Sequence, residues 1–483
     1  MQIPSVLLNR KVQIGIGIAL IIVVVIGIIS VSSGKPKKST TNISKSEPVS
    51  LTWWKPFYGK DVYTKIIEDF KKIPGNEEIT IDIVSKNYDD NYYNTLIGDI
   101  ARKAGPDIFS LRNDDLPAYK EFMTPLTNIT GGDLAEYKQN FVDLVVKETI
   151  DRDKVYAISS YVDNLQLYYN KNILAQNSIA LPPATWGELD KQLPSLNKRS
   201  LNSTAFTQSA ISLGVGGRGL EGLSNINRHE DILPMLILQD GGQIYDTKSE
   251  KILFGLSKNQ KDLDIKLITG TNFVIDESDK QSNPAYKAIK FYTDFANQSS
   301  SRYSWNTTSD YNTDAFINGK LAYILQYSYF GDEIKQRNER LPFDVSPLPQ
   351  LDLAIKKTYG SYFMDGMNRS LESTPVKKIA AEKFLKYLTT KEAQEQFAGI
   401  TKLPASRKDV IKSQLSSDSQ IRMFAAGALY ADNYYKPDVV ACEKLWSDMI
   451  ERVQYSGQPL SESINQAINQ YSVLVQKGPK IRR

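Results

Sequence analysis

The longest uncharged stretch of the chain, residues 12–30 (VQIGIGIALIIVVVIGIIS), limits how the chain can be arranged. A helix of these nineteen residues is about 28 Å long, close to the roughly 30 Å hydrocarbon core of a bilayer. The residues that follow contain no second stretch as apolar. The sequence therefore predicts one transmembrane anchor, with residues 1–11 in the cytoplasm, that carries a large soluble body.

A cleaved secretory signal is the alternative interpretation of this stretch. Arg10 and Lys11 precede the apolar run as in a signal peptide, but such runs usually have about 7–15 residues and end at a small-residue cleavage site. The weak sequence at residues 30–32 is the only candidate site, so an uncleaved anchor is preferred. A bacterial lipid anchor is excluded because it needs a cysteine just after the run, and the only cysteine is Cys442.

The soluble body is expected outside the membrane, in the extracellular or periplasmic space. Basic residues flank both sides of the apolar run in similar numbers, so the positive-inside rule does not determine the orientation of the helix. A body of this size is translocated largely regardless of its charges. One cysteine allows no internal disulfide, so core burial alone must stabilise the fold.

Size and charge narrow the class of this body. Residues 31–50 are rich in Gly, Lys, Pro, Ser and Thr and predict a flexible linker. About 430 residues remain, too many for one core, and two lobes are expected. Without Arg10 and Lys11 the chain has 57 basic against 55 acidic residues, which argues against nucleic acid as a partner. The 27 tyrosines suit a surface that meets hydroxyl-bearing ligands, although many could instead fill the two cores.

Strand-like and helix-like segments alternate from residue 51 onward. The run LTWW is followed by apolar residues at helical spacing over residues 62–72, and then Ile79, Ile81 and Ile83 alternate with polar residues. The segment after Gly105-Pro106 begins another strand. This order is how a parallel sheet with covering helices begins.

The second half of the chain repeats these patterns. Thr185 and Glu188 in PPATWGEL form a predicted capping box, and Thr389 and Glu392 form another. Between these, PAYKAIKFYTDFA predicts a helix and LAYILQY a strand, and VKKIAAEKFLKYL predicts the helix before the second box. Residues 245–282 are polar with scattered glycines and predict a loop.

No motif of an assembled catalytic or cofactor site is recognisable, so no cofactor or metal is expected. With a single histidine, a Ser-His-Asp triad would depend on His229. The glycines around residues 214–219 are not followed by a P-loop lysine. Paired carboxylates such as Asp114-Asp115 could serve glycoside hydrolysis, but among 55 acidic residues such pairs are expected by chance.

The ordered series of segments resembles the family-1 extracellular solute-binding proteins, the maltose-binding-protein-like sugar receptors of ABC importers. The segment VYAISSYVDNLQLYYNKNIL is the most similar piece. GPDIFSL, PPATWGEL, LQDGGQIYD, INGKLAYILQYSYF and TPVKKIAAEKFLKYLTTKEAQEQF continue the series in the family's order. Two features depart from the pattern: no lipobox cysteine is present, and the 245–282 region is long.

The resemblance implies an α/β, two-lobed periplasmic-binding-protein-like (type II) fold with a hinge between the lobes, behind one N-terminal transmembrane helix. Lobe one would take residues 51–163 and 359–411, and lobe two residues 165–357 and 417–471, with a basic C-terminal tail at 472–483. Closure of the lobes on a ligand would be what a permease detects.

Seven side chains are nominated as ligand contacts by their positions in the family pattern. Aromatic faces would pack on sugar rings, and carboxylates and amides would hold the hydroxyl groups. Each has an alternative as a core or hinge residue. The seven are Trp54, Asn113, Asp114, Asp163, Tyr329, Tyr362 and Trp446.

The resemblance therefore implies a membrane-tethered, monomeric receptor that captures a carbohydrate and delivers it to ABC permease subunits. Two alternatives stay open. One is an extracellular carbohydrate-active enzyme, and the other is a surface adhesin on the same fold. The sequence does not identify the ligand.

Overall fold

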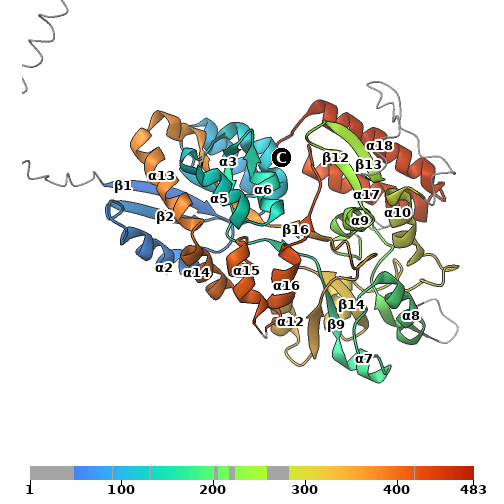
Figure 1. The fold of residues 1–483 in the computed structure, drawn as a ribbon. Helices are drawn as coiled ribbons and strands as arrows, with labels where there is room; N and C mark the ends of the chain where they lie inside the picture. The colour runs from blue at the N-terminus through green and yellow to red at the C-terminus, as the bar shows by residue number, and fades with distance from the viewer. Residues whose placement is uncertain are drawn as a thin grey trace, which may run out of the picture. The chain divides into compact units, whose positions relative to one another are not determined.

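The computed structural model describes residues 48–89, 91–129, 132–200, 205–216, 224–257, 282–417 and 419–482. The predicted membrane helix at residues 12–30 and most of the predicted linker lie outside these residues. Within the described ranges no helix is both long and apolar enough to cross a bilayer. The described residues form two α/β lobes, side by side in Figure 1, each with its own core.

The first lobe is built on a six-stranded sheet. The strands predicted near residues 51, 79 and 108 are confirmed, and they pair in parallel with β1 between the other two. β17 comes from far along the chain and runs antiparallel to β3. In sheet order the strands are β2 (Ile79–Ser85), β1 (Val49–Lys55), β3 (Ile108–Arg112), β17 (Phe363–Asn368) and β4 (Met123–Thr124), and β7 (Ala157–Ile158) also pairs with β17.

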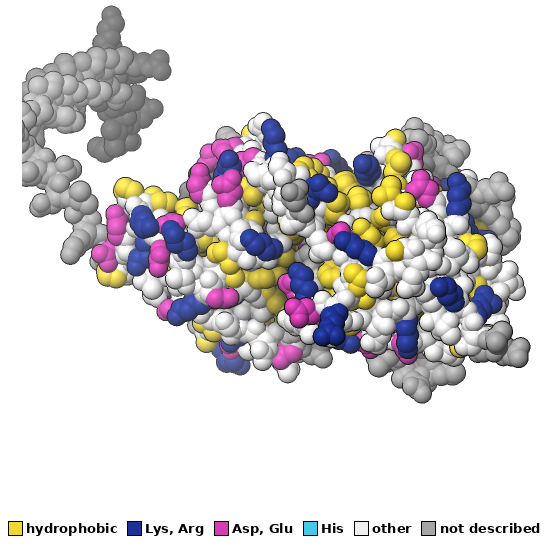
Figure 2. Space-filling view, turned by 90° about the horizontal axis from the view of Figure 1, so that it is seen from below, with side chains coloured by type: hydrophobic (Ala, Val, Ile, Leu, Met, Phe, Trp, Pro, Cys, Tyr) yellow, Lys and Arg dark blue, Asp and Glu magenta, His cyan; other side chains and the backbone are white. Residues whose placement is uncertain are grey.

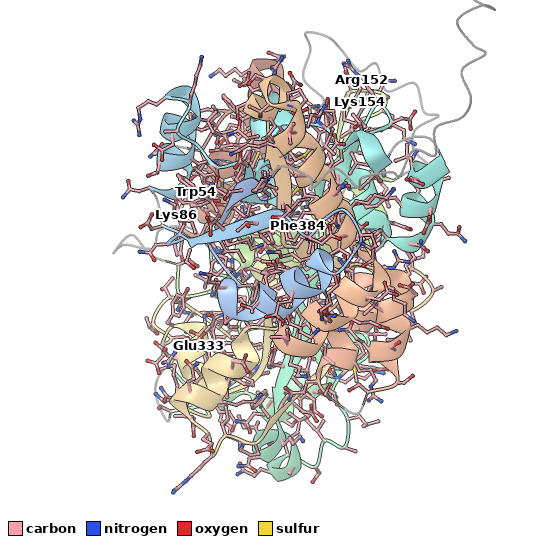
Figure 3. The ribbon with its side chains drawn as sticks, turned by 90° about the vertical axis from the view of Figure 1, so that its left-hand side faces the viewer. Trp54, Lys86, Arg152, Lys154, Glu333 and Phe384 are labelled. Atoms are coloured by element: carbon pink, nitrogen blue, oxygen red, sulfur yellow. The ribbon has the colours of Figure 1, made fainter. Side chains whose placement is uncertain are left out.

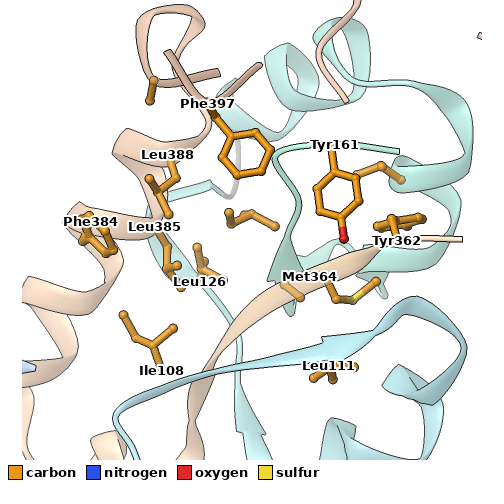
Figure 4. Packing of buried hydrophobic residues seen from close by; sticks show 14 of the residues in the cluster. Ile108, Leu111, Leu126, Tyr161, Tyr362, Met364, Phe384, Leu385, Leu388 and Phe397 are labelled. Atoms are coloured by element: carbon orange, nitrogen blue, oxygen red, sulfur yellow. The ribbon is translucent and has the colours of Figure 1, made fainter. Parts of the chain in front are cut away.

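Amphipathic helices cover this sheet. α2 buries Val62, Ile66 and Phe70, the face that their spacing predicts. Phe384 of α13 and Phe397 of α14 point into the same core, as Figure 4 shows. The elements that complete the lobe are α2 (Lys60–Lys71), α3 (Tyr92–Ala101), α4 (Leu116–Tyr119), α5 (Gly132–Asn140), α6 (Asp143–Thr149), the β5 (Ile150–Asp151) and β6 (Lys154–Val155) pair, α13 (Pro375–Leu388), α14 (Lys391–Thr401) and α15 (Lys408–Leu415).

The junction between α13 and α14 lies one residue later than predicted. Thr389 was expected to cap the second helix together with Glu392, but the N-cap is Thr390, whose hydroxyl accepts the N–H of Ala393 at 3.3 Å. Two adjacent threonines offer the same chemistry, and α13 extends to Leu388 with Thr389 as its C-cap. The prediction of a second capping box at Thr389 is therefore wrong by one position.

The second lobe has a five-stranded sheet in the order β10-β11-β14-β9-β15. The predicted strand LAYILQY is β14, which lies between β11 and β9 and is fully buried. Thr185 caps α8 as predicted, accepting the N–H of Glu188 at 3.1 Å. The elements are β9 (Gln166–Asn170), α7 (Lys171–Gln176), α8 (Trp186–Leu196), β10 (Lys198–Arg199), β11 (Phe206–Ile211), α9 (His229–Gln239), α10 (Pro284–Asp294), α11 (Asn312–Ile317), β14 (Leu321–Gln326), α12 (Phe330–Arg337), β15 (Phe343–Ser346), α17 (Val439–Gln454) and α18 (Leu460–Lys477).

Part of the region predicted as a loop at residues 245–282 is a hairpin. β12 (Gly242–Asp246) pairs antiparallel with β13 (Lys251–Ser257) and continues directly from the Gly241-Gly242 turn. Gly241 has φ +76, a conformation that a glycine adopts without strain. Residues 258–281 lie outside the described residues.

Three short strands join the two lobes. β8 (Asp163–Asn164) pairs antiparallel with β16 (Thr358–Ser361), and β16 pairs in parallel with β18 (Ala431–Asp432). α16 (Ile421–Ala428) packs on β8 so closely that a Cβ on Gly427 would lie 2.0 Å from Asn164 Oδ1. These strands form the crossing between the two lobes.

The end of the described chain returns from lobe two to lobe one. α18 continues to Lys477, so residues 472–477, which the sequence places in a tail, are helical. Lys480 then contacts Asp438 at 2.8 Å, Ile481 packs on the first core, and Arg482 Nε donates to Asp115 at 3.3 Å. Figure 1 shows this segment running from α18 toward the helices of lobe one.

Candidate functional site

A cavity of about 850 Å³ lies between the lobes beside the hinge strands. Lobe one contributes Asn113, Asp114 and residues of α6, and lobe two contributes the β12–β13 turn. Residues 433–436, which lead from β18 into lobe two, complete the wall. Ligand sites in proteins commonly have about 300–1,000 Å³, so this space is large enough for a small solute.

Asp114 forms a buried ion pair across the hinge. Its carboxylate lies 2.8 Å from Lys436 Nζ, and Asn433 Nδ2 donates to it at 3.1 Å. The side chains of Asp114 and Lys436 are 4 % and 1 % exposed, so water screens the pair very little. Burial lowers the pKa of Lys436, but the carboxylate of Asp114 and the other acidic groups around it, among them Asp231 and Glu443, together raise that pKa above its ordinary value.

Arg112 connects the same region to helix α17 of lobe two. Its Nη2 lies 2.7 Å from Glu443 and 3.2 Å from Asp114. Burial alone would raise the pKa of Glu443, but the guanidinium of Arg112 and then the ammonium of Lys436 lower that pKa to about 2. Arg112, Asp114, Lys436 and Glu443 therefore form one network of alternating charges between the lobes.

Asn113 and Tyr362 are held together by hydrogen bonds. Asn113 Oδ1 accepts the backbone N–H of Tyr362 at 3.1 Å, and both side chains donate to Glu148 of α6, Tyr362 Oη at 2.6 Å and Asn113 Nδ2 at 3.2 Å. Burial raises the pKa of Glu148 to about 7, and the bond from Tyr362 opposes this rise. Tyr362 is 1 % exposed, so its ring packs in the first core (Figure 4).

Asp163 fixes the first hinge strand to lobe two. Its carboxylate accepts the backbone N–H of Ser328 at 3.1 Å, the hydroxyl of Ser328 at 2.8 Å and the N–H of Asn164 at 2.8 Å. Burial raises its pKa to about 6, and the bonds from Ser328 oppose that shift. Its acceptor positions are thus used within the protein, as the hinge interpretation of this residue expects.

Tyr329 follows Ser328 and has a 40 % exposed ring. Its hydroxyl accepts a hydrogen bond from Arg228 Nη2 at 3.2 Å and donates to Gln326 Oε1 at 3.3 Å. Tyr329 is therefore the one nominated aromatic whose ring is substantially open to solvent among the described residues.

Both nominated tryptophans are buried in the lobes. Trp54, at the end of β1, is 7 % exposed, and Lys86 Nζ lies 3.6 Å above its ring, as Figure 3 shows. Trp446 is 1 % exposed, stacks on Phe254 with ring centroids 5.4 Å apart, and donates its indole N–H to Tyr434 at 2.7 Å. In this conformation neither indole ring forms the wall of the interlobe cavity.

The structure thus arranges the nominated residues in two groups and leaves the two tryptophans apart. Asn113 and Asp114 line the cavity and Tyr362 donates to Glu148 in its wall, whereas Asp163 binds Ser328, the residue before Tyr329. The charged partners Arg112, Glu148, Arg228, Lys436 and Glu443 were not predicted. Only Arg112 could have been found from the sequence, because it directly precedes the nominated Asn113 and Asp114. The other four are isolated charged residues in helices and loops without a recognisable motif.

Lys and Arg side chains are interspersed with Asp and Glu on the face in Figure 2, in keeping with the near-neutral charge. Among the described residues, no three His, Cys, Asp or Glu side chains are grouped so that they could hold a metal ion.

Solved structures of three sugar-binding proteins share this fold. The cyclic α-maltosyl-1,6-maltose binding protein of Arthrobacter globiformis aligns with a TM-score of 0.67 and 14 % identity over 89 % of this chain and 100 % of its own. The sugar-binding protein MalE of Xanthomonas citri gives 0.64 and 17 %, over 89 % and 98 %. The MalE domain of Bdellovibrio bacteriovorus bound to maltotriose gives 0.58 and 17 %, over 89 % and 99 %.

At these identities the structural likeness establishes the fold. Curated protein sequences give no significant match. The family model described as bacterial extracellular solute-binding protein, however, matches residues 65–425, which is well over half of the chain. The chain therefore belongs to the bacterial extracellular solute-binding proteins.

Proposed function

We propose that this protein is a membrane-tethered extracellular receptor that captures a carbohydrate, an oligosaccharide in particular, between two closing lobes and delivers it to an ABC permease. The observation that carries the proposal is the interlobe cavity at the hinge, whose wall contains polar groups of both lobes. There carboxylates, amides and tyrosines of both lobes surround a cavity of about 850 Å³ in a solute-binding fold. Such groups hold sugar hydroxyls in directional hydrogen bonds.

The structural neighbours support a carbohydrate as the ligand. The Bdellovibrio bacteriovorus domain is bound to maltotriose, and the Arthrobacter globiformis protein binds a cyclic maltosyl saccharide. Of the nominated contacts, Tyr329 has the exposed ring that stacking on a sugar needs, and Asp114 lines the cavity. Asn113, Asp163 and Tyr362 would support the walls around the ligand, and Trp54 and Trp446 would reach it only after a change of conformation.

The tether is the part of the proposal that the sequence supports. The stretch at residues 12–30 has the length and apolarity of a single membrane span, and no cysteine follows it to carry a lipid. A linker at residues 31–50 would let a monomeric two-lobed body open and close within reach of permease subunits. Fractionation of cells that express the full chain tests this, because a cleaved product would appear in the soluble fraction.

Binding without turnover distinguishes this receptor from a carbohydrate-active enzyme. The full chain, purified in detergent, is mixed with a panel of mono- and oligosaccharides, and the melting temperature is measured. A ligand that binds only the folded state raises the melting temperature, and the stabilisation grows with the logarithm of the ligand's excess over the dissociation constant. Release of product from a labelled glycan would contradict the proposal and favour the enzyme.

Lobe closure is tested by a distance between the lobes. Val376 on α13 and Val473 on α18 are exposed and lie in different lobes, and Cys442 is buried, so cysteines placed at the two valines can be spin-labelled selectively. We expect the inter-label distance to shorten when the stabilising saccharide is added. An unchanged distance with a saturating ligand would contradict capture by closure.

A further inference from the structure

Arg228 occupies an unusual position beside Tyr329. It is the N-cap of α9 with φ 71, in the left-handed region that residues other than glycine rarely adopt. Its guanidinium lies 5.3 Å from the ring centroid of Tyr327 and 5.8 Å from that of Tyr329. Two aromatic rings and a constrained backbone therefore hold this side chain in place.

The guanidinium of Arg228 uses little of its hydrogen-bonding capacity. Nη2 donates to Tyr329 Oη at 3.2 Å, but Nε is shielded from solvent and has no partner among the described residues. No carboxylate of the described chain forms an ion pair with it at 4.0 Å or less, whereas Arg112 pairs with two. A guanidinium has five N–H donors, so this cation is left largely unpaired.

The nearest carboxylates already have other partners. Asp163 accepts hydrogen bonds from Ser328 and Asn164, and Asp231 accepts the hydroxyl of Tyr327 at 2.8 Å. Both influence Arg228 through space only. The two carboxylates attract the guanidinium electrostatically but accept no hydrogen bond from it.

A second unpaired donor lies on the other side of the Tyr329 hydroxyl. Gln326 on β14 is 0 % exposed, its Oε1 accepts from Tyr329, and its Nε2 has no partner among the described residues. Buried donors without acceptors are rare and unfavourable in folded proteins. Arg228 and Gln326 therefore present two unused donors beside an exposed aromatic ring.

We infer that this cluster is an acid-recognising subsite, in which Arg228 and Gln326 bind the carboxylate of a uronate-containing saccharide while Tyr329 packs on its ring. A carboxylate offers only hydrogen-bond acceptors, and its negative charge compensates the positive charge of an unpaired guanidinium. A neutral hydroxyl would leave the positive charge of Arg228 uncompensated. The inference rests on the proposed function, since it names the class of carbohydrate that the receptor takes.

The test compares acidic saccharides with uncharged counterparts of the same shape. Full-length protein in detergent is titrated by calorimetry with oligogalacturonates, oligoglucuronates and oligomannuronates, and with their methyl esters, in which the carboxylate charge is removed. Maltotriose serves as a neutral saccharide. We expect one acidic series to bind at least tenfold more tightly than its methyl ester, and the preference to shrink as salt is added.

Two variants assign the preference to the cluster. Arg228→Gln should reduce the acid-to-ester preference at least tenfold, and Gln326→Leu should reduce it less, because it removes a neutral donor. Arg340→Gln is the matched control, since Arg340 is an exposed arginine of the same lobe. Melting temperatures without ligand show whether each variant is folded, and Arg228→Lys, which keeps the charge, replaces Arg228→Gln if that variant is unfolded.

The possible results separate this inference from the proposed function. Tight binding of neutral saccharides with no preference for acids overturns the acidic subsite and leaves a sugar receptor. An acidic preference that Arg228→Gln leaves unchanged also overturns the subsite. Binding of no saccharide at all, neutral or acidic, contradicts the proposed function and the inference with it.

Discussion

The ammonium of Lys436 lies 2.8 Å from the carboxylate of Asp114, and this buried pair joins lobe one to the segment that leads from the hinge into lobe two. Each charge is withdrawn from water, so each depends on nearby opposite charges, and Arg112 is a second partner of Asp114 at 3.2 Å. The pair therefore couples the stability of the fold to the relative position of the lobes.

Replacement of Lys436 by methionine should be strongly destabilising. The change leaves the buried Asp114 with only Arg112, which is also paired with Glu443, as a counter-ion, and breaking buried pairs costs about 3–5 kcal/mol. The double variant Lys436→Met, Asp114→Asn should recover part of that loss in urea unfolding, because no uncompensated charge remains. The control is Lys55→Met, which breaks the buried pair of Lys55 with Asp365 inside lobe one. It should lower stability without changing the inter-lobe distance, and an equal change in distance for both variants would refute a hinge-specific role.

The packing of α16 on the hinge can be tested at Gly427. An alanine there would place Cβ 2.0 Å from Asn164 Oδ1 and 2.2 Å from Gln166 Nε2, so either these buried, hydrogen-bonded amides or the helix must shift. We expect a loss of about 1–3 kcal/mol in urea unfolding. Gly399, in the last turn of α14, has no atom within 4 Å of its added Cβ, and Gly399→Ala should be neutral or stabilising by up to about 1 kcal/mol. Similar losses in both variants would contradict this packing.

The role of the exposed ring in binding is tested by Tyr329→Ala. Once a saccharide ligand is found, this variant should weaken its binding about tenfold, or ~1.4 kcal/mol, because the stacking face and the hydroxyl that orders Arg228 are both lost. Tyr455, 52 % exposed at the end of α17, is the matched control, and Tyr455→Ala should bind as the wild type does. Calorimetric titration measures both, and unchanged affinity in Tyr329→Ala would place the ligand elsewhere.

Glu148 should make stability depend on pH. Its pKa is raised by burial from 4.5 to about 7, so the folded state binds its proton more tightly than the unfolded state. The stabilisation from the protonated form is therefore present below pH 4.5 and is lost as the pH rises toward 7. Relative to Glu148→Gln, the wild type should lose stability across this window in urea titrations at several pH values. A difference that is constant with pH would show that Glu148 titrates normally.

The architecture could be predicted because it depends on patterns that survive in a single sequence. The alternation of Ile79, Ile81 and Ile83 indicated a strand, and the face of Val62, Ile66 and Phe70 indicated the covering helix. Both reflect which side of an element is buried, and this is decided locally.

The site was harder to predict because it depends on distant segments meeting. Arg112 and Glu443 are separated by 331 positions and form an ion pair only through the hinge topology. Trp446 lies on the buried face of α17 with Cys442 and Met449 and stacks on Phe254, so its helical spacing agrees with a core position, whereas its place in the family pattern suggested a ligand contact. Side-chain position near a hinge therefore needs coordinates, whereas the order of strands and helices does not.

The segment that follows α18 returns to lobe one, so lobe two is inserted between parts of the chain that belong to lobe one. The described chain enters the fold through β1 of lobe one, and Arg482 ends against Asp115 and Tyr119 of the same lobe. Lys480 is held beside Pro437 and Asp438, next to the hinge, where a rotation of lobe two produces little displacement. A force applied between β1 and Arg482 would therefore act on lobe one alone, and lobe two would be free to rotate about the hinge strands.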